Sequence, residues 1–577
     1  MMPAVPLGLA GDRPVSGIQQ LIAPKSLADQ LVQGLANCGI STYFGVPGGA
    51  IEPLFNALAR EQSLGRVEVI LMRSEAGAAF AADGYYRATR RIAACTTTTG
   101  PGVTNLTTAV MAAYSDRIPI LLITPQAPMP RQGRGAFQDS CADAIDVVKV
   151  LESCTRYSTT VVHPSQLHFR LSRAVHLART PPTGPVHVSI PSDLLAGPPE
   201  QGAPLLQLNQ LPASTPVDEL ACLDLVNAVT SARFPVFYIG DDAGLDAQEL
   251  CAVARQLGAA VVSSPAGKRW ISHKDPIYAG VVGFAGHQRA ASAIRHSDLV
   301  VTFGATFDEF STNAWNVFDG RRVFSVDRHG AYAYRQPGAR VVIAETYQVV
   351  ERLRSAMPSV CPSRIGLSSY PPPTLVRSNG DAPVHPLDLM RWLNLGVPDD
   401  VVVHVDTGSS MAWSTRELVR PVPDTYRVAM GACSMCWAIS AAIGAAIATH
   451  ERVICLTGDG AMLMSSLELT VAAEQNLPVT YLILNDSSLG MVRHGQRLAG
   501  AENIATRLAP VRFDLLAQAC GVEAIRVDCR TSLARVPAEW LSCPNGGPRL
   551  IDVVIDPNAV PPIGQRIAAL NLETSLR

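Results

Sequence analysis

The stretch RVICLTGDGAMLMSSLELTVAAEQNLPVTYLILND, residues 452–486, contains two apolar runs joined by an amphipathic segment. The first run ends in a turn at Asp459, and the second ends at Asp486. Apolar runs of this length, separated by a segment with three- and four-residue apolar spacing, indicate a strand, a helix and a parallel strand. The carboxyl ends of such strands meet at one edge of a sheet, where α/β proteins bind ligands. The helix is expected to have an apolar side formed by Met462, Leu463, Leu467, Leu469 and Ala472 or Ala473.

The same alternation of apolar runs and helical segments extends along the whole chain. It indicates an α/β fold made of doubly wound parallel sheets. Two stretches rich in Pro, Gly and Ser, residues 196–216 and 361–383, are expected to be linkers. The expected domains are residues 26–195, 217–355 and 384–562, with tails at residues 1–25 and 563–577.

The composition argues against several classes of function. The 577 residues exceed what one hydrophobic core usually serves, so we expect several domains. The net charge is -2, which provides no excess of basic residues for nucleic acid or anionic lipid. No apolar run approaches the length of a membrane span and no signal peptide is evident, so we expect a cytoplasmic protein. The 13 cysteines are scattered and are interpreted as small apolar residues, since one isolated pair, Cys433 and Cys436, is weak evidence for zinc or redox chemistry.

The turn at Asp459 has the composition of a phosphate site. Glycines flank Asp459, so the backbone can approach an anion closely, and the N–H groups of the following helix favour a phosphate. A carboxylate that faces a phosphate requires a cation between them, and oxygen ligands beside a diphosphate favour Mg²⁺. Asp486 reaches the same edge and would add a second carboxylate. The alternative interpretation is an ordinary strand-to-helix turn.

The residues Gly458-Asp459-Gly460, followed by 24 residues and Asn485, resemble the signature of thiamin diphosphate enzymes of the acetolactate synthase and pyruvate decarboxylase type. In that family two asparagines end the signature, whereas Asp486 takes the second place here. The resemblance implies thiamin diphosphate and Mg²⁺ as cofactors. It implies metal ligation by Asp459, Asp486 and the carbonyl of Ser488. It also implies a pyrimidine-binding first domain, a central domain and a diphosphate-binding third domain.

A second motif lies in the first domain. The segment RSEAGAAFAADGYYRAT, residues 73–89, resembles the family's RHEQGAxHAAEGYARA, with Ser74 where histidine is common. The resemblance implies that Glu75 hydrogen-bonds the aminopyrimidine of the cofactor and promotes loss of its C2 proton. The alternative is a plain charge on a helix face. Small apolar neighbours favour the functional role for Glu75.

Further segments extend the resemblance over nearly the whole chain. GAFQDS, residues 135–140, matches the synthases and implies that Phe137 and Gln138 line the reaction pocket. GACSMCWAISAAIGAA, residues 431–446, places Met435 beneath the thiazolium, although a methionine here could also be core filling. Met491 would shape the same space. The residues assigned to cofactor binding in the first and third domains are Gly48, Gly49, Met435, Gly458, Gly460, Ala461, Asn485, Gly490 and Met491.

The central domain resembles the synthases' flavin domain less closely. GFAGH (283–287) and GATFDEF (304–310) occupy the places of two flavin-binding segments, with Thr306 and Phe310 instead of arginines. The resemblance implies FAD as a further cofactor, with Gly283, Asp308 and Asp327 as its contacts. The alternative is a domain that only supports the dimer.

The resemblance implies a reaction class. We expect decarboxylation of a 2-oxo acid such as pyruvate, followed by carboligation to a second carbonyl, as in the acetolactate synthase large subunit. Gly495 replaces a tryptophan that narrows the acceptor site in the synthases, so a larger acceptor is expected. The alternatives are a simple 2-oxo acid decarboxylase, an acyloin synthase of a secondary pathway, acyl transfer to phosphate, a flavin oxidase, and a non-catalytic paralogue.

The family also implies an oligomer. Glu75 belongs to the first domain and the diphosphate site to the third, and the family joins them across a subunit boundary. The resemblance therefore implies a homodimer or homotetramer that acts on small 2-oxo acids. Whether a regulatory small subunit binds stays open.

Overall fold

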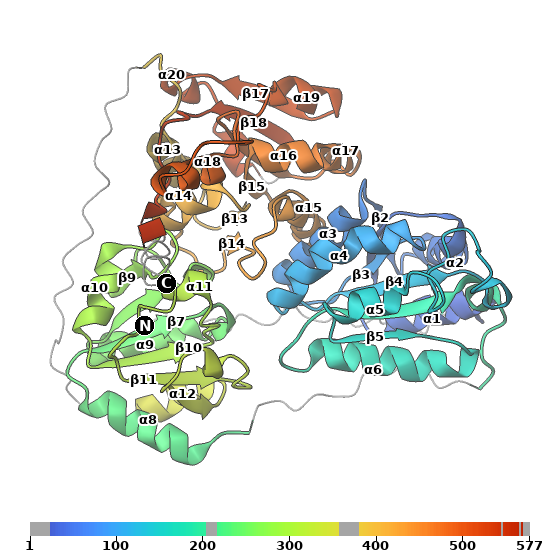
Figure 1. Cartoon of the computed structure of the whole chain (residues 1–577), viewed down its shortest axis with the longest axis horizontal. Coiled ribbons are helices and arrows are strands. Elements are labelled where there is room, and N and C mark those ends of the chain that lie inside the picture. The colour runs from blue at the N-terminus through green and yellow to red at the C-terminus, as the bar shows by residue number, and fades with distance from the viewer. Residues whose placement is uncertain (1–22, 203–215, 357–379, 544–545, 565–566, 569–577) are drawn as a thin grey trace.

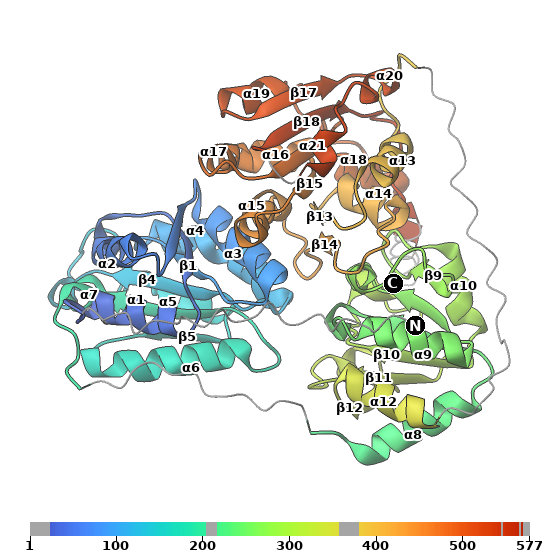
Figure 2. The same ribbon diagram turned by 180° about the vertical axis from the view of Figure 1, so that it is seen from behind.

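The computed structural model describes residues 23–202, 216–356, 380–543, 546–564 and 567–568. They form three α/β bodies, coloured blue to cyan, green to yellow and orange to red along the chain (Figure 1). The third body lies beside both of the others, and the view from behind shows the same arrangement (Figure 2). Most of the expected tails and of the linker at 361–383 lies outside the described residues.

The first body is a parallel sheet with helices on its faces. Its strands are β1 (Thr42–Gly45), β2 (Glu68–Leu71), β3 (Ala94–Thr96), β4 (Leu121–Gln126), β5 (Tyr157–Thr160) and β6 (Val186–Pro191). Its helices are α1 (Leu27–Asn37), α2 (Glu52–Ser63), α3 (Glu75–Thr89), α4 (Pro101–Ser115), α5 (Val147–Glu152), α6 (Leu167–Arg179) and α7 (Ser192–Ala196). The strand order is β2-β1-β3-β4-β6-β5. The inner strands β3, β4 and β6 are wholly buried, because helices cover both faces.

The central body is a second parallel sheet. Its strands are β7 (Pro235–Ile239), β8 (Ala260–Ser263), β9 (Tyr278–Val281), β10 (Leu299–Phe303), β11 (Val323–Asp327) and β12 (Arg340–Ile343). Its helices are α8 (Glu219–Ser231), α9 (Ala247–Leu257), α10 (Gln288–His296), α11 (Glu309–Thr312) and α12 (Thr346–Ala356). The strand order is β12-β11-β10-β7-β8-β9.

The third body is built in the same way. Its strands are β13 (Val402–Val405), β14 (Tyr426–Val428), β15 (Val453–Gly458), β16 (Val479–Asn485), β17 (Glu523–Val527) and β18 (Arg549–Val554). Its helices are α13 (Pro386–Gly396), α14 (Ser409–Glu417), α15 (Trp437–Thr449), α16 (Asp459–Ser465), α17 (Leu469–Glu474), α18 (Gly490–Leu498), α19 (Phe513–Ala519), α20 (Arg530–Leu533) and α21 (Glu539–Ser542). The order β14-β13-β15-β16-β18-β17 repeats that of the first sheet, whereas the central sheet differs.

Helices α3 and α15 join the first and third bodies (Figure 1). The two helices approach so closely that a Cβ atom on Gly84 would overlap the backbone of Ala441. A Cβ atom on Gly444 would likewise overlap the backbone of Ala81. Small residues on both helices therefore allow the close contact. Since α3 begins at Glu75, this contact also fixes where Glu75 lies relative to the third domain.

The segment after Asp459 differs from the single helix expected. It forms α16, a 3-10 turn η7 (Ser466–Glu468) and α17. Met462, Leu469 and Ala472 are buried as expected, but Leu463 and Leu467 are 40% and 65% exposed. The prediction was wrong for both leucines. Leu463 directly follows the buried Met462 in α16, so the two side chains point to different sides of the helix. Leu467 lies in the 3-10 turn, which interrupts the helical repeat.

Two expectations from the composition concern membrane-spanning helices and the role of the cysteines, and both can be compared with the described residues. Among them, none of the helices has both the length and the apolar character needed to cross a bilayer. The described cysteines are free thiols. Their interpretation as small apolar residues is confirmed for the buried ones, which are Cys95, Cys141, Cys154, Cys222, Cys251 and Cys455.

Candidate active site

The turn after β15 lies where the sequence predicts it. β15 ends at Gly458, and Asp459, the first residue of α16, is buried. β16 pairs in parallel with β15, with Gly458 opposite Leu484, so Asp486 follows at the same edge of the sheet. The two acidic side chains therefore meet at the carboxyl edge of the third sheet, where parallel sheets bind ligands.

Both carboxylates converge on one backbone amide. The N–H of Ser488 donates to Asp459 Oδ2 at 3.2 Å and to Asp486 Oδ1 at 3.2 Å. Burial and the nearby Asp486 carboxylate raise the pKa of Asp459 to about 7, and burial raises the pKa of Asp486. Asp459 is buried and Asp486 is half-buried, and two carboxylates this close repel each other unless a cation lies between them. Their oxygens fit a hard divalent cation such as Mg²⁺.

Glycines keep the space around this turn clear. A Cβ atom on Gly458 would meet nothing within 4 Å, which leaves room for a ligand beside the turn. A Cβ atom on Gly490 would lie 2.6 Å from Asp486 Oδ2, and one on Gly460 would lie 2.7 Å from Leu489 Cδ2. Larger residues at Gly460 or Gly490 would therefore displace the loop that carries Asp486.

The loop before α15 brings Met435 to the same turn. Met435 Cε lies 3.4 Å from the position that a Cβ atom on Gly460 would take. The next residue, Cys436, has a left-handed backbone with φ of 73°, and its thiol donates to the carbonyl of Ala461 at 3.4 Å. Met435 therefore lies beside the turn that carries Asp459.

Two buried carboxylates that sequence reasoning missed hold this loop. Asp406 accepts hydrogen bonds from the Cys436 N–H at 3.1 Å and the Thr457 hydroxyl at 2.9 Å. Asp116, from the first domain, accepts the Gly431 N–H at 2.6 Å. Asp406 directly follows an apolar run, as Asp459 does, and could have been found by that signal. Asp116 has no comparable signal, because its partner lies in another domain.

Glu75 occupies the first position of α3. Ser74 caps the helix, since its hydroxyl accepts the Gly77 N–H at 3.0 Å. Asn105 Nδ2 donates to Glu75 Oε2 at 3.0 Å, which orients the carboxyl group. A Cβ atom on Gly102 would lie 3.4 Å from Glu75 Oε1, so the absence of a side chain there leaves that oxygen uncovered.

A third missed carboxylate, Glu468, connects the third domain to the start of α3. It is buried, and it accepts hydrogen bonds from the Ser74 hydroxyl at 2.8 Å and the Arg73 N–H at 3.3 Å. Burial raises the pKa of Glu468. Because these contacts fix the residues before Glu75, Glu468 is a positioning residue for that carboxyl group.

The other predicted site residues of the first domain are Gly48, Gly49, Phe137 and Gln138. Gln138 lies beside Thr99, whose hydroxyl donates to Gln138 Oε1 at 3.4 Å. Gly48 packs on Thr98, because a Cβ atom there would lie 2.6 Å from its side chain, whereas one on Gly49 would meet nothing within 4 Å. Phe137 is 89% exposed in the single chain.

Three family models match the chain along most of its length. The N-terminal TPP binding domain of the thiamine pyrophosphate enzymes matches residues 25–147, and their central domain matches residues 223–353. Their C-terminal TPP binding domain matches residues 406–553. The first match contains Glu75, and the last contains Asp459 and Asp486.

Comparison with curated proteins gives the same result. The chain is 30% identical over 544 residues to the acetolactate synthase isozyme 2 large subunit of Escherichia coli (strain K12), covering 92% of this chain and 95% of that protein. The chain belongs to the thiamine pyrophosphate enzyme family. It is also 28% identical over 556 residues to the chloroplastic acetolactate synthase of Arabidopsis thaliana, covering 92% of this chain and 81% of that one.

A solved structure confirms the fold of this thiamine pyrophosphate enzyme. The X-ray structure, from Mycobacterium smegmatis, is described as a thiamin diphosphate-dependent enzyme. It matches with a TM-score of 0.78 at 21% identity, covering 92% of this chain and 99% of that one. Both the family and the α/β fold predicted from the sequence are therefore confirmed.

Within this thiamine pyrophosphate enzyme, two predicted cofactor residues have partners inside the third domain. Asn485 Nδ2 donates to Asp552 Oδ1 at 2.8 Å and to the Val511 carbonyl at 3.2 Å. Met491 packs against the hydrophobic core of the domain. Glu75 is held by Asn105 of the first domain, whereas Asp459 and Asp486 meet at the Ser488 N–H of the third domain.

The residues assigned to the flavin lie at the carboxyl edge of the central sheet. A Cβ atom on Gly283 would overlap the carbonyl oxygen of Phe310, so the two predicted flavin segments pack together. Asp308 caps the short helix α11, and Asp327 ends β11. These side chains therefore already have roles within the protein.

Proposed function

We propose that the chain catalyses thiamin diphosphate- and Mg²⁺-dependent decarboxylation of pyruvate, with carboligation of the remaining two-carbon unit to a second carbonyl compound. The observation that carries the proposal is the convergence of Asp459 and Asp486 on the Ser488 amide at the edge of the third sheet. It supports a cation site of the kind that a diphosphate cofactor needs. The names of the curated relatives support the acetolactate synthase reaction.

The third domain would hold the cofactor and its metal. Asp459, Asp486 and the carbonyl of Ser488 would bind Mg²⁺, and the open turn at Gly458 would receive the diphosphate. When bound, thiamin diphosphate supplies a nucleophilic carbon and accepts the electron pair that is released as carbon dioxide leaves. Met435, next to Gly460, would support the cofactor from one side.

Glu75 would move a proton in this reaction. Its Oε2 is held by Asn105, and its Oε1 faces the space that Gly102 leaves open. A carboxyl group fixed in this way can exchange a proton with a ring nitrogen within hydrogen-bond reach. Gln138 and Phe137 would position the second carbonyl compound, and Met491 would shape the pocket.

We propose that a second copy of the chain completes the site, as a homodimer or a homotetramer. Glu75 belongs to the first domain and Asp459 to the third, and large apolar side chains of both domains are exposed. Phe137 and Ile145 of the first domain are 89% and 65% exposed. Met464 and Leu467 of the third domain are 63% and 65% exposed. Burial of these apolar side chains against a second chain would remove them from water and so favour association.

The decisive test is the identity of the product. Purified protein with thiamin diphosphate, Mg²⁺ and pyruvate should consume pyruvate and form 2-acetolactate, as followed by NMR. Acetaldehyde alone would instead show a simple decarboxylase, and acetyl phosphate in phosphate buffer would show acyl transfer. If pyruvate is untouched while the cofactor binds, the donor assignment is wrong.

A larger acceptor is the second candidate function, and the observation that favours it is the space at Gly495. A Cβ atom on this residue of α18 would meet nothing within 4 Å. Gly495→Trp should therefore fold normally and reduce the use of bulky acceptor aldehydes or 2-oxo acids, by about 10-fold or more if it removes a few kcal/mol of transition-state binding.

Competition between a small and a bulky acceptor, with both products quantified in one reaction, measures this effect. Gly495→Ala is the matched control, since it adds only one methyl group and should leave the product ratio nearly unchanged. An unaltered ratio in Gly495→Trp would show that this position does not face the acceptor.

A further inference from the structure

The central sheet has the strand order of a dinucleotide-binding fold. Its order β12-β11-β10-β7-β8-β9 changes direction between β7 and β10, and such sheets bind ligands outside the carboxyl ends of these two strands. The resemblance to the synthases implies a flavin dinucleotide in this domain. A cavity of about 340 Å³ lies at this edge, between the central and first domains.

The turns after β7 and β10 pack against each other and are joined by backbone hydrogen bonds. The Gly240 N–H donates to the Phe303 carbonyl at 2.8 Å, and the Asp242 N–H donates to the Gly304 carbonyl at 3.1 Å. A Cβ atom on Gly240 would overlap the carbonyl oxygen of Gly304. In a dinucleotide site, amides of this turn bind the diphosphate. Here they are already hydrogen-bonded within the protein.

The same turn carries two carboxylates, Asp241 and Asp242, in the 3-10 helix η4 (Asp241–Ala243). Asp242 accepts hydrogen bonds from Arg328 Nη2 at 2.9 Å and from Arg117 Nη1 at 3.4 Å. Burial alone would raise the pKa of Asp242, but the two guanidinium groups lower it below its usual value. Asp242 therefore stays ionised, and it engages two arginines that could otherwise bind a phosphate.

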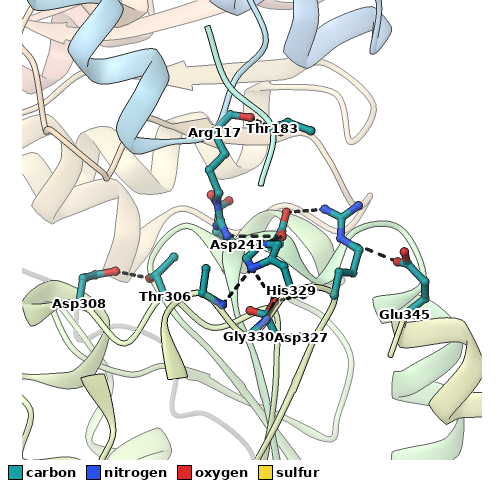
Figure 3. Close-up of polar contacts among 12 residues, drawn as sticks. Arg117, Thr183, Asp241, Thr306, Asp308, Asp327, His329, Gly330 and Glu345 are labelled. Carbon is teal, nitrogen blue, oxygen red and sulfur yellow. Dashed lines mark hydrogen bonds and ion pairs between the residues drawn. The ribbon is translucent and has the colours of Figure 1, made fainter. Parts of the chain in front are cut away.

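Arg117 brings the first domain into this network. Its carbonyl accepts the Thr183 hydroxyl at 2.5 Å, and its side chain reaches toward the central domain (Figure 3). Arg117 is buried, and its guanidinium group lies 5.0 Å from the centre of the Tyr332 ring. On the far side of Asp242, Arg328 Nε lies 3.8 Å from a Glu345 oxygen. The ion pairs thus run from the first domain across the crevice to the end of the central sheet.

The other expected flavin contacts are also occupied. Asp327 Oδ1 accepts the N–H groups of His329 at 2.8 Å and Gly330 at 3.0 Å (Figure 3). The Thr306 hydroxyl donates to the Asp308 carboxylate. Six carboxylates and five guanidinium groups line the cavity of about 340 Å³. The neighbouring cavity of about 570 Å³, which Asp308 lines, has four carboxylates and two guanidinium groups. A diphosphate would therefore add negative charge where carboxylates already exceed arginines. The residues present do not fit a dinucleotide.

We infer that this chain is a flavin-free member of its family, and that the crevice of the central sheet instead holds an ion network that joins the first domain to the central one. Asp242 is its centre, with Arg117 on one side and Arg328 on the other. This inference goes beyond the proposed carboligation, none of whose steps requires a flavin.

The first test is the flavin content of the full-length protein. It is purified with thiamin diphosphate and Mg²⁺ from cells supplied with riboflavin, denatured, and assayed for flavin per chain. FAD and ADP are then added separately to the purified protein, and the Tm is measured. Only traces of flavin and no Tm shift with either nucleotide are expected. Close to one flavin per chain, or a rise in Tm with FAD or ADP, would overturn the inference.

The flavin content and the Tm do not depend on turnover, so they remain interpretable if the substrate assignment is wrong.

A second test addresses the ion network through Arg117→Met, Asp242→Asn and the double variant. Each single change should lower Tm by about 2 to 4 °C, and the double variant should lower it by less than the sum. Additive effects would overturn the network.

Lys149→Met is the matched control for this second test. It removes an ion pair with Asp146 in which the lysine side chain is 73% exposed. Such a surface pair contributes little to stability, so Tm should stay nearly unchanged. A fall as large as that of Arg117→Met would mean that loss of a positive charge, rather than loss of the network, lowers Tm, and this too would overturn the network.

Discussion

Glu75→Gln is expected to lower the rate of pyruvate consumption by about 10²- to 10⁴-fold, the range that a general acid–base group contributes. The amide retains the size of the side chain and can still meet Asn105, whose Nδ2 donates to Glu75 Oε2 at 3.0 Å. It cannot exchange a proton at the other position, which Glu75 Oε1 occupies beside Gly102. Because the metal and diphosphate would be held by the third domain, the Tm increase caused by Mg²⁺ and thiamin diphosphate should be retained. Steady-state rates and thermal unfolding of the same preparations measure both properties.

Glu52→Gln is the matched control for Glu75→Gln. Glu52 is the first residue of α2, as Glu75 is of α3, but its side chain is exposed. Both substitutions lose the same favourable interaction with a helix N-terminus, which is worth about 0.3 to 1 kcal/mol. Only Glu75→Gln should lose activity. Equal rates for the two variants would show that Glu75 has no part in the reaction.

The sheets could be predicted because parallel strands covered on both faces require continuous apolar runs. β15 and β16 are such runs, and the structure places them side by side in register. The exposure of Leu467 could not be predicted, because helical spacing alone does not show where a helix is interrupted. The interruption at η7 instead brings Glu468 to the first domain, through a contact between distant parts of the chain.

The site could be predicted in part for the same reason. Asp459 and Asp486 each follow a buried strand, so their meeting at one edge follows from the topology of parallel sheets. Glu468 and Asp116 act through partners that are 394 and 315 residues away, and no local pattern indicates such pairs. The role of Glu75 was inferred from its motif, because a glutamate at a helix start has the same spacing whether or not it is catalytic.

Asp459→Ala is expected to abolish the stabilisation of the protein by Mg²⁺ and thiamin diphosphate. A ligand present at 100 times its Kd stabilises the native state by about 2.7 kcal/mol, which gives a measurable rise in Tm. In the parent protein this rise should appear only when metal and cofactor are both present, and a chelator should remove it. Asp459→Ala should show no rise, because the diphosphate would meet Asp486 without a bound cation. Asp459→Ala should also lose its activity, because the cofactor would not be bound.

Comparison with Asp486→Asn distinguishes an effect on metal binding from an effect on the stability of the fold. Either substitution removes one of the two carboxylates that converge on the Ser488 N–H and repel each other, so neither should lower the Tm of the cofactor-free protein by much. Asparagine keeps an oxygen ligand while it removes a charge, and the family signature has asparagine at this place. Asp486→Asn should therefore retain most of the Tm rise that Asp459→Ala loses. A full response in Asp459→Ala would place the metal elsewhere, whereas loss of the response in both variants would mean that both charges are needed to bind it.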